Sequence, residues 1–167
     1  FFSTFGGSNL SCRIGTEVLD IVDDEKLQKN AKTVGDFLIS GLSELKKKFD
    51  FIGDVRGMGL FIGVEIIRGD GTEDSELCGY IKNKMRENRI LIGSDGPKDN
   101  VIKIRPPLTI ELEDAQMLLA TLSEILEGTV SLKIETRDCS MSFDFKRDGR
   151  LSKRECNNFS ATFPVLP

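Results

Sequence analysis

The chain has 167 residues and a net charge of −4, with 23 basic and 27 acidic side chains. That length suits one domain with a hydrophobic core plus a short appendage. Because the charges are well mixed and no long basic run occurs, nucleic acid is not expected as a partner. No apolar run approaches the roughly 20 residues that a membrane span needs. The chain contains no histidine, which excludes a Ser-His-Asp or Cys-His nucleophile and a histidine-based metal site built from these residues.

Four cysteines are scattered through the sequence without a C-x-x-C pair or a spacing typical of zinc sites. They indicate reduced thiols in an intracellular protein, with disulfides as the alternative. The first residues lack the basic start, apolar core and cleavage site of a signal peptide, and position 1 is not methionine. We therefore expect the chain to begin inside a longer protein.

Helical spacing of apolar residues predicts two helices in the first third of the chain. Ser8 or Asn9 can cap the first helix, which we expect to run to about Val22. Two aspartates follow and favour the start of a second helix over residues 25–48. The apolar faces comprise Leu10, Ile14, Val18, Ile21 and Val22 in the first helix, and Leu27, Ala31, Val34, Leu38, Leu42 and Leu45 in the second.

Glycines and β-branched residues predict two strands in the centre of the chain. The segment from Gly53 to Glu65 reads Gly-Asp-Val-Arg-Gly-Met-Gly-Leu-Phe-Ile-Gly-Val-Glu. Residues 51–56 and 60–67 are expected to be strands, and the glycines between them permit a tight turn. A structural turn that leads into a core strand is the simpler interpretation of this segment by itself.

The complete order is helix, helix, strand, strand, helix, strand, strand, helix. This order predicts an α+β fold, with helices packed on one face of a small, mostly antiparallel sheet. Residues 1–128 are predicted to form this domain, and the polar, irregular sequence of residues 129–167 is interpreted as a tail. The elements after the central strands are a helix over 74–88, a strand over 90–92, a turn at 94–97, a strand over 101–104 ended by Pro106-Pro107, and a helix from about 111 to 127 stopped by Gly128.

Three short segments carry chemical information: Thr4-Phe5-Gly6-Gly7, Gly53-Asp54-Val55-Arg56-Gly57 and Lys103-Ile104-Arg105-Pro106-Pro107-Leu108. A hydroxyl beside paired glycines ahead of a helix suits a phosphate, because the backbone amides can approach it closely. Over residues 1–127 the segments together resemble the C-terminal third of the class III aminotransferases, which are pyridoxal-phosphate enzymes of fold type I. The resemblance implies that residues 1–128 are the small C-terminal domain of such an enzyme, with pyridoxal 5′-phosphate as cofactor.

The resemblance also assigns roles to individual residues. It implies that Thr4, Gly6 and Gly7 bind the cofactor phosphate, and that in a homodimer this loop serves the neighbouring subunit's active site. The family usually continues the two glycines with Asn-Pro, whereas this chain has Ser8-Asn9. Family members are often mitochondrial, so mitochondria are a candidate location.

In this family the Schiff-base lysine and the acidic residue at the pyridine nitrogen both precede the threonine loop. We therefore expect both to lie outside these 167 residues. No catalytic residue is assigned within the chain, and the chain alone is expected to be inactive.

The residue type at position 103 distinguishes two branches of the family that the chain resembles. Most class III aminotransferases have an arginine three residues before the first proline, where its planar fork pairs with a substrate α-carboxylate. This chain has Lys103 at that position and Arg105 directly before the prolines. That pattern resembles the phospho-lyases, which eliminate phosphate and ammonia from ethanolamine phosphate or phosphohydroxylysine.

Lys103 and Arg105 are accordingly expected to bind a phosphorylated small-amine substrate. A transaminase that moves an amino group between an amino acid and an oxo acid is the alternative within the family. The simpler structural interpretation leaves Lys103 at a strand edge with its charge in solvent.

The tail contains a partial match to a calcium-binding EF-hand loop. Lys146 occupies the third position, where an oxygen ligand is needed, and the residues before the loop are poor helix formers. A calcium-binding or interaction module is therefore the alternative from another functional class, beside a disordered basic tail. The matching residues are Asp144, Asp148, Gly149, Ser152 and Glu155, at the first, fifth, sixth, ninth and twelfth positions of the loop.

Overall fold

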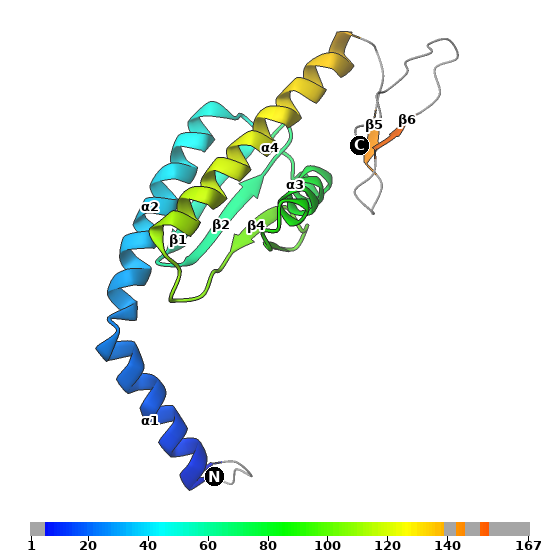
Figure 1. The fold of residues 1–167 in the computed structure, drawn as a ribbon. Helices are drawn as coiled ribbons and strands as arrows, with labels where there is room; N and C mark the ends of the chain where they lie inside the picture. The colour runs from blue at the N-terminus through cyan, green and yellow to red at the C-terminus, as the bar shows by residue number, and fades with distance from the viewer. Residues whose placement is uncertain (1–5, 139–142, 146–150, 154–167) are drawn as a thin grey trace, which may run out of the picture.

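The computed structural model describes residues 6–138, 143–145 and 151–153. These residues form an α+β fold in which helices cover one face of a four-stranded antiparallel sheet (Figure 1), and this architecture confirms the predicted fold class. No helix in these ranges is long and apolar enough to cross a membrane. The elements in chain order are α1 (Asn9–Asp24), α2 (Leu27–Lys48), β1 (Ile52–Met58), β2 (Phe61–Ile66), α3 (Ser75–Glu87), β3 (Gly93–Asp95), β4 (Val101–Ile104), α4 (Leu112–Asp138), β5 (Phe143–Phe145) and β6 (Leu151–Lys153).

The sheet has the strand order β1-β2-β4-β3. Successive side chains of a strand point to opposite faces, so each strand contributes to both faces of the sheet. The isoleucines and the valine at alternate positions of β2 and β4 are buried beneath the helices. We call the other face the open face, and it consists of Asp54, Arg56, Met58, Phe61, Gly63, Glu65, Gly93, Asp95, Val101 and Lys103.

Three helices complete the core on the covered face (Figure 1). Asp74 caps α3, because its Oδ1 accepts a hydrogen bond of 3.0 Å from the backbone N–H of Leu77. Each large apolar side chain that is fully buried stabilises the fold by about 1.5–3 kcal/mol relative to leaving it exposed. Each helix buries apolar side chains that recur every three or four residues. They are Val34, Leu38 and Leu42 of α2, Leu77, Ile81 and Met85 of α3, and Ala115, Leu118, Leu122 and Leu126 of α4.

Helix α1 projects away from this core (Figure 1). Ser8 caps it as predicted, with its Oγ accepting from the backbone N–H of Ser11. The two aspartates predicted to open the second helix belong instead to the last turn of α1, because Lys26 adopts a left-handed φ of 53° and separates the two helices. No side chain of α1 is buried against the described residues, and Leu10 is 71% exposed.

The predicted strand over residues 90–92 is wrong, because the edge strand β3 comprises residues 93–95. Arg89 has a left-handed φ of 65°, which turns the chain directly after α3. Leu91 is 85% exposed, so the apolar run that suggested a strand does not enter the ladder. Ser94 and Asp95, predicted as the first half of a turn, are therefore strand residues, and the turn follows them.

Helix α4 continues to Asp138, past the predicted end near Glu127. Gly128 lies inside the helix and does not stop it. On either side of that glycine Leu126 and Thr129 are buried, and the Thr129 hydroxyl donates to the carbonyl oxygen of Ile125 at 2.8 Å. Packing outweighs the cost of about 1 kcal/mol for glycine within a helix. The division between a domain over 1–128 and a tail over 129–167 stays a prediction.

The β1–β2 connection packs against α2 at a glycine. The turn itself is Gly59-Leu60, since Gly53 and Gly57 lie within β1. A side-chain carbon added to Gly35 in the middle of α2 would overlap the backbone carbonyl of Gly59. Glycine at position 35 therefore lets the helix backbone approach the turn that begins β2.

We expect the substitution Gly35→Ala to lower the free energy of unfolding by about 1–3 kcal/mol, because overpacking against backbone outweighs the better helix propensity of alanine. Gly79→Ala in α3 is the matched control, since a methyl group there meets no atom within 4 Å. The control should leave stability unchanged or raise it by up to about 1 kcal/mol. Urea denaturation of the three proteins measures both effects. A Gly35→Ala protein as stable as the parent would contradict the close contact.

Candidate functional site

The open face carries a row of alternating cations and glycines. Arg56 of β1 pairs in register with Gly63 of β2, Gly63 pairs with Lys103 of β4, and Lys103 pairs with Gly93 of β3. The row runs across the strands, because register partners lie side by side in a sheet. Gly63 alone lies between the two cations, and Gly93 lies on the far side of Lys103. Lys103 therefore has a glycine on each side in the row, at positions 63 and 93.

Lys103 forms an ion pair with Asp95. Its Nζ donates to the Asp95 Oδ2 at 2.8 Å, and the lysine side chain is 30% exposed. The two residues are diagonal neighbours on adjacent strands, because Lys103 lies opposite Gly93 and Asp95 lies opposite Val101. A long side chain can span such a diagonal. The pKa of Asp95 is lowered, chiefly by the hydrogen bond from Lys103 and in smaller part by the charge of Arg105.

Asp95 is the site residue that the sequence did not reveal. The sequence predicts a turn at Asp95, because the predicted edge strand lies three residues before β3. With β3 over residues 93–95, the period of two places Asp95 on the same face as Lys103. The signal that could have found it is the charge pattern, since an acidic residue eight positions before a strand lysine is a candidate cross-strand partner.

Arg56 has a structural role within the open face. Its Nη1 donates to the Asp54 Oδ2 at 3.2 Å and to the Glu65 Oε2 at 3.1 Å, across the β1–β2 ladder. The pKa of Asp54 is lowered, first by this hydrogen bond, and Lys46 contributes as well. Asp54 and Glu65 thus both bind Arg56. The guanidinium of Arg56 is therefore engaged by two carboxylates within the sheet.

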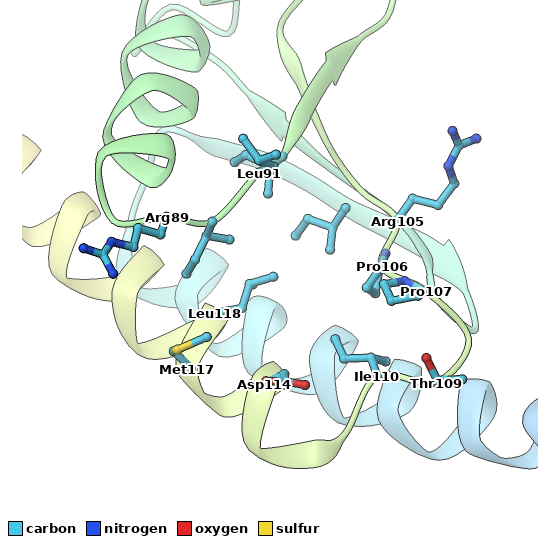
Figure 2. A pocket seen from close by; sticks show the side chains of 13 residues that line it. Arg89, Leu91, Arg105, Pro106, Pro107, Thr109, Ile110, Asp114, Met117 and Leu118 are labelled. Atoms are coloured by element: carbon cyan, nitrogen blue, oxygen red, sulfur yellow. The ribbon is translucent and has the colours of Figure 1, made fainter.

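Arg105 directly follows β4 and is exposed. It lines a cleft of about 440 Å³ between α4 and the Pro106-Pro107 segment, and Figure 2 shows its side chain directed away from that cleft. It also lines a larger hollow of about 930 Å³, where the prolines meet the Gly57–Phe61 turn region and α2. In the described part of the chain Arg105 forms no ion pair, so its guanidinium can bind a ligand without releasing a carboxylate.

The predicted phosphate loop is described in part. Thr4 lies outside the described residues, while Gly6 and Gly7 form an exposed turn immediately before the capped start of α1. Gly7 has a φ of 77°, and a side-chain carbon there would meet no atom within 4 Å. An exposed glycine turn before a helix N-terminus fits a phosphate group, because the first backbone amides of the helix have no helical partner.

The glycine turn and Lys103 lie far apart within one chain. Gly6 and Gly7 are at the outer end of α1, and Lys103 is on the sheet beyond the base of that helix (Figure 1). One chain therefore does not bring its own phosphate loop to its own open face. The predicted roles of Thr4, Gly6, Gly7, Lys103 and Arg105 as ligands stay predictions.

The EF-hand prediction falls mainly outside the described part of the chain. Asp148 and Glu155 lie outside the described residues. Asp144 and Ser152 pair in register in the small β5–β6 ladder. An EF-hand loop follows a helix, whereas residues 143–145 form a strand. Among the described residues no group of three or more cysteine or acidic side chains could hold a metal ion. The calcium ligand set stays a prediction.

Known proteins match this chain over most of its length. Residues 2–126 match the family model of the aminotransferase class-III enzymes. The chain is 37% identical over 137 residues to a Drosophila melanogaster protein named alanine–glyoxylate aminotransferase 2-like, which covers 80% of this chain and 28% of the relative. It is 31% identical over 129 residues to the Caenorhabditis elegans ethanolamine-phosphate phospho-lyase homolog 1, which covers 75% of this chain and 28% of the relative.

Comparison with solved structures leads to the same family. A phospholyase from Arthrobacter in complex with phosphoethanolamine matches with a TM-score of 0.73 and 37% sequence identity, over 76% of this chain and 31% of that chain. The chain therefore spans less than a third of the length of these proteins. Its sequence and its fold lead to one assignment: the chain belongs to the class III aminotransferase family of pyridoxal-phosphate-dependent enzymes.

Proposed function

We propose that this chain is the C-terminal part of a phospho-lyase that acts on a phosphorylated amine such as ethanolamine phosphate. The observation that carries the proposal is Lys103, an ammonium held on the open face at the position where most class III aminotransferases have arginine. A lysine ammonium is a compact point charge with three donors, which suits a phosphate, while a carboxylate is best bound by the planar fork of arginine.

In the proposed reaction Lys103 binds and orients the substrate phosphate. Arg105, two residues further along the chain, supplies a second cation as the carbon–oxygen bond to phosphate breaks and negative charge gathers on the leaving group. The cofactor supplies the electron sink that lets the carbon framework give up that group. The carbon–nitrogen bond also breaks, and one water molecule completes the products, which are inorganic phosphate, ammonia and an aldehyde.

The proposal includes a homodimer with shared active sites. Gly6 and Gly7 lie at the far end of α1 from Lys103, so the phosphate loop of one subunit would serve the site of its partner. The Schiff-base lysine would come from a part of the protein outside these 167 residues. A mitochondrial location belongs to the same proposal and can be tested by cell fractionation.

A transaminase is the second candidate, and Arg105 favours it. Its guanidinium forms no ion pair with the described residues, and its planar donors match a substrate α-carboxylate. The Drosophila relative carries an aminotransferase name. Under this alternative Arg105 would bind the carboxylate of an amino acid, and Lys103 would remain paired with Asp95.

We expect the full-length protein to release equal amounts of phosphate and ammonia from ethanolamine phosphate. Lys103→Gln should raise the KM for that substrate by about tenfold or more, because a charge-assisted hydrogen bond contributes about 1.5–3 kcal/mol. Lys84→Gln is the control, since Lys84 pairs with Glu87 on the surface of α3 and should keep the parent KM. Steady-state assays of both products measure these values. Amino transfer to an oxo acid without phosphate release would establish the transaminase instead.

We also expect residues 1–167 alone to lack activity and to bind pyridoxal phosphate poorly, because the Schiff-base lysine lies elsewhere in the proposal. Borohydride treatment of the chain with the cofactor, followed by mass spectrometry of peptides, should show no stoichiometric adduct at any single lysine. The full-length protein, treated identically, is the positive control. One fully labelled lysine within residues 1–167 would contradict this expectation.

A further inference from the structure

We propose that Asp95 is an internal competitor for the anion that Lys103 binds. It holds the lysine ammonium while the site is empty, loses it to the substrate's anionic group when that group arrives, and regains it as the product phosphate leaves. Asp95 is thus a positioning residue that acts through Lys103 and sets how tightly the site holds an anion. This inference rests on the proposed binding of an anion by Lys103.

The path of the Lys103 side chain supports this role. The Cε of Lys103 lies 3.4 Å from the point that a side-chain carbon on Gly93 would occupy. The lysine side chain therefore runs over that glycine toward the β3 edge of the sheet. There the ammonium meets the Asp95 Oδ2 at 2.8 Å. The ammonium therefore already occupies a place beside an anion, and that anion belongs to the protein.

Asp95 keeps its place independently of Lys103. Its other oxygen, Oδ1, accepts a hydrogen bond of 2.9 Å from the backbone N–H of Gly96. On the opposite face of the same strand, Lys82 of α3 donates to the Ser94 hydroxyl at 2.9 Å. Strand pairing with β4 completes the support. The carboxylate is thus fixed by the fold, and the flexible partner that can leave the contact is Lys103.

The strength of the pair suits a contact that must open in each reaction cycle. The side chain of Lys103 is 30% exposed and that of Asp95 is 61% exposed. An ion pair this exposed changes an equilibrium constant by at most roughly fivefold. A phosphate monoester carries a charge of about −1.5 to −2 at neutral pH, more than one carboxylate. It can therefore draw the Lys103 ammonium away from Asp95, whereas a single carboxylate offers Lys103 little that Asp95 does not.

The neighbouring cations Arg56 and Lys46 have carboxylate partners other than Asp95, so the proposed exchange involves Lys103 and Asp95 alone. Arg56 is engaged by Asp54 and Glu65 on the other side of Gly63. Lys46 also pairs with Asp54. Arg105 is close enough to contribute to the lowered pKa of Asp95, so this cation also lies near the pair at which the anion would bind.

The decisive variant is Asp95→Asn in the full-length protein. Asparagine keeps the oxygen that accepts from the Gly96 N–H, so β3 and its turn retain their support, while the competing charge is removed. We expect inorganic phosphate, used as the probe in titration calorimetry, to bind about two- to fivefold more tightly than to the parent. Inhibition of turnover by inorganic phosphate should strengthen by the same factor. A residue with only a structural role would instead weaken binding when altered.

A double-mutant cycle assigns the effect to Lys103. In the Lys103→Gln background the Asp95→Asn substitution should leave phosphate affinity unchanged, because no ammonium remains to compete for. Asp54→Asn is the control for the electrostatic potential of the open face as a whole, since it also removes one negative charge, but beside Arg56 instead of Lys103. The inference is overturned when Asp95→Asn weakens or leaves unchanged the affinity for phosphate, or when its tightening persists without Lys103.

A measurement on the unaltered side chain of Asp95 provides a second test. Because the hydrogen bond from Lys103 holds the pKa of Asp95 low, both Lys103→Gln and saturation with phosphate should raise that pKa toward its usual range. Carbon-13 NMR titration of the carboxyl groups follows it, with Asp70 as the internal reference, since its lowered pKa depends chiefly on Thr72. An Asp95 pKa that neither change moves would contradict the exchange.

These tests separate the inference from the proposed function. A protein that releases no phosphate from ethanolamine phosphate fails the proposed function through the product assay. The phosphate titrations still decide between competition and its absence, since they measure equilibrium binding at Lys103 and require no turnover.

Discussion

The antiparallel pairing of β2 with β4 is the constraint on which the rest of the structure depends. It sets Val64 opposite Ile102, and both side chains are buried beneath the helices. Lys103 follows Ile102 and therefore faces outward. A slip of one residue would place the ammonium in the core. An unpaired charge there costs far more than one apolar side chain gains by burial. The hydrophobic core thus decides where the candidate ligand-binding lysine stands.

Elements with strong hydrophobic periodicity could be predicted from the sequence, and elements held by their neighbours could not. The strand predicted over residues 101–104 has the bounds of β4. The helical spacing over residues 25–48 predicted Val34, Leu38 and Leu42, which α2 buries in the core. β3 consists of Gly93, Ser94 and Asp95, which have low strand propensity. It becomes a strand because β4 offers a pairing edge and lysines bind its side chains from both faces. The end of α4 was missed for a related reason, since buried side chains on both sides of Gly128 keep the helix intact.

In the candidate site too, the sequence pointed to a residue but not to the partner that its surroundings supply. Resemblance to a family pointed to Lys103, because the residue stands at a fixed distance from two prolines. Its partner depends on the register of β3, and no pattern local to the sequence encodes that register. Arg56 is comparable, since its contacts with Asp54 and Glu65 arise from the β1–β2 ladder. Chemistry-bearing residues are therefore easier to find in a sequence than the groups that orient them.

The ion pairs of the open face have a consequence for how that face can be used. Covering a sheet face removes water from its charges, and a buried charge without a partner is strongly destabilising. Lys103 has its partner in Asp95, and Arg56 has Asp54 and Glu65. The face can therefore lose water, as a closed active site requires, without leaving these cations uncompensated. Under the proposed exchange, an anionic ligand would take the place of a resident carboxylate beside the lysine, so its affinity would be the difference between two similar contacts. A site that works by this exchange would release its product more readily than one built from unpaired cations.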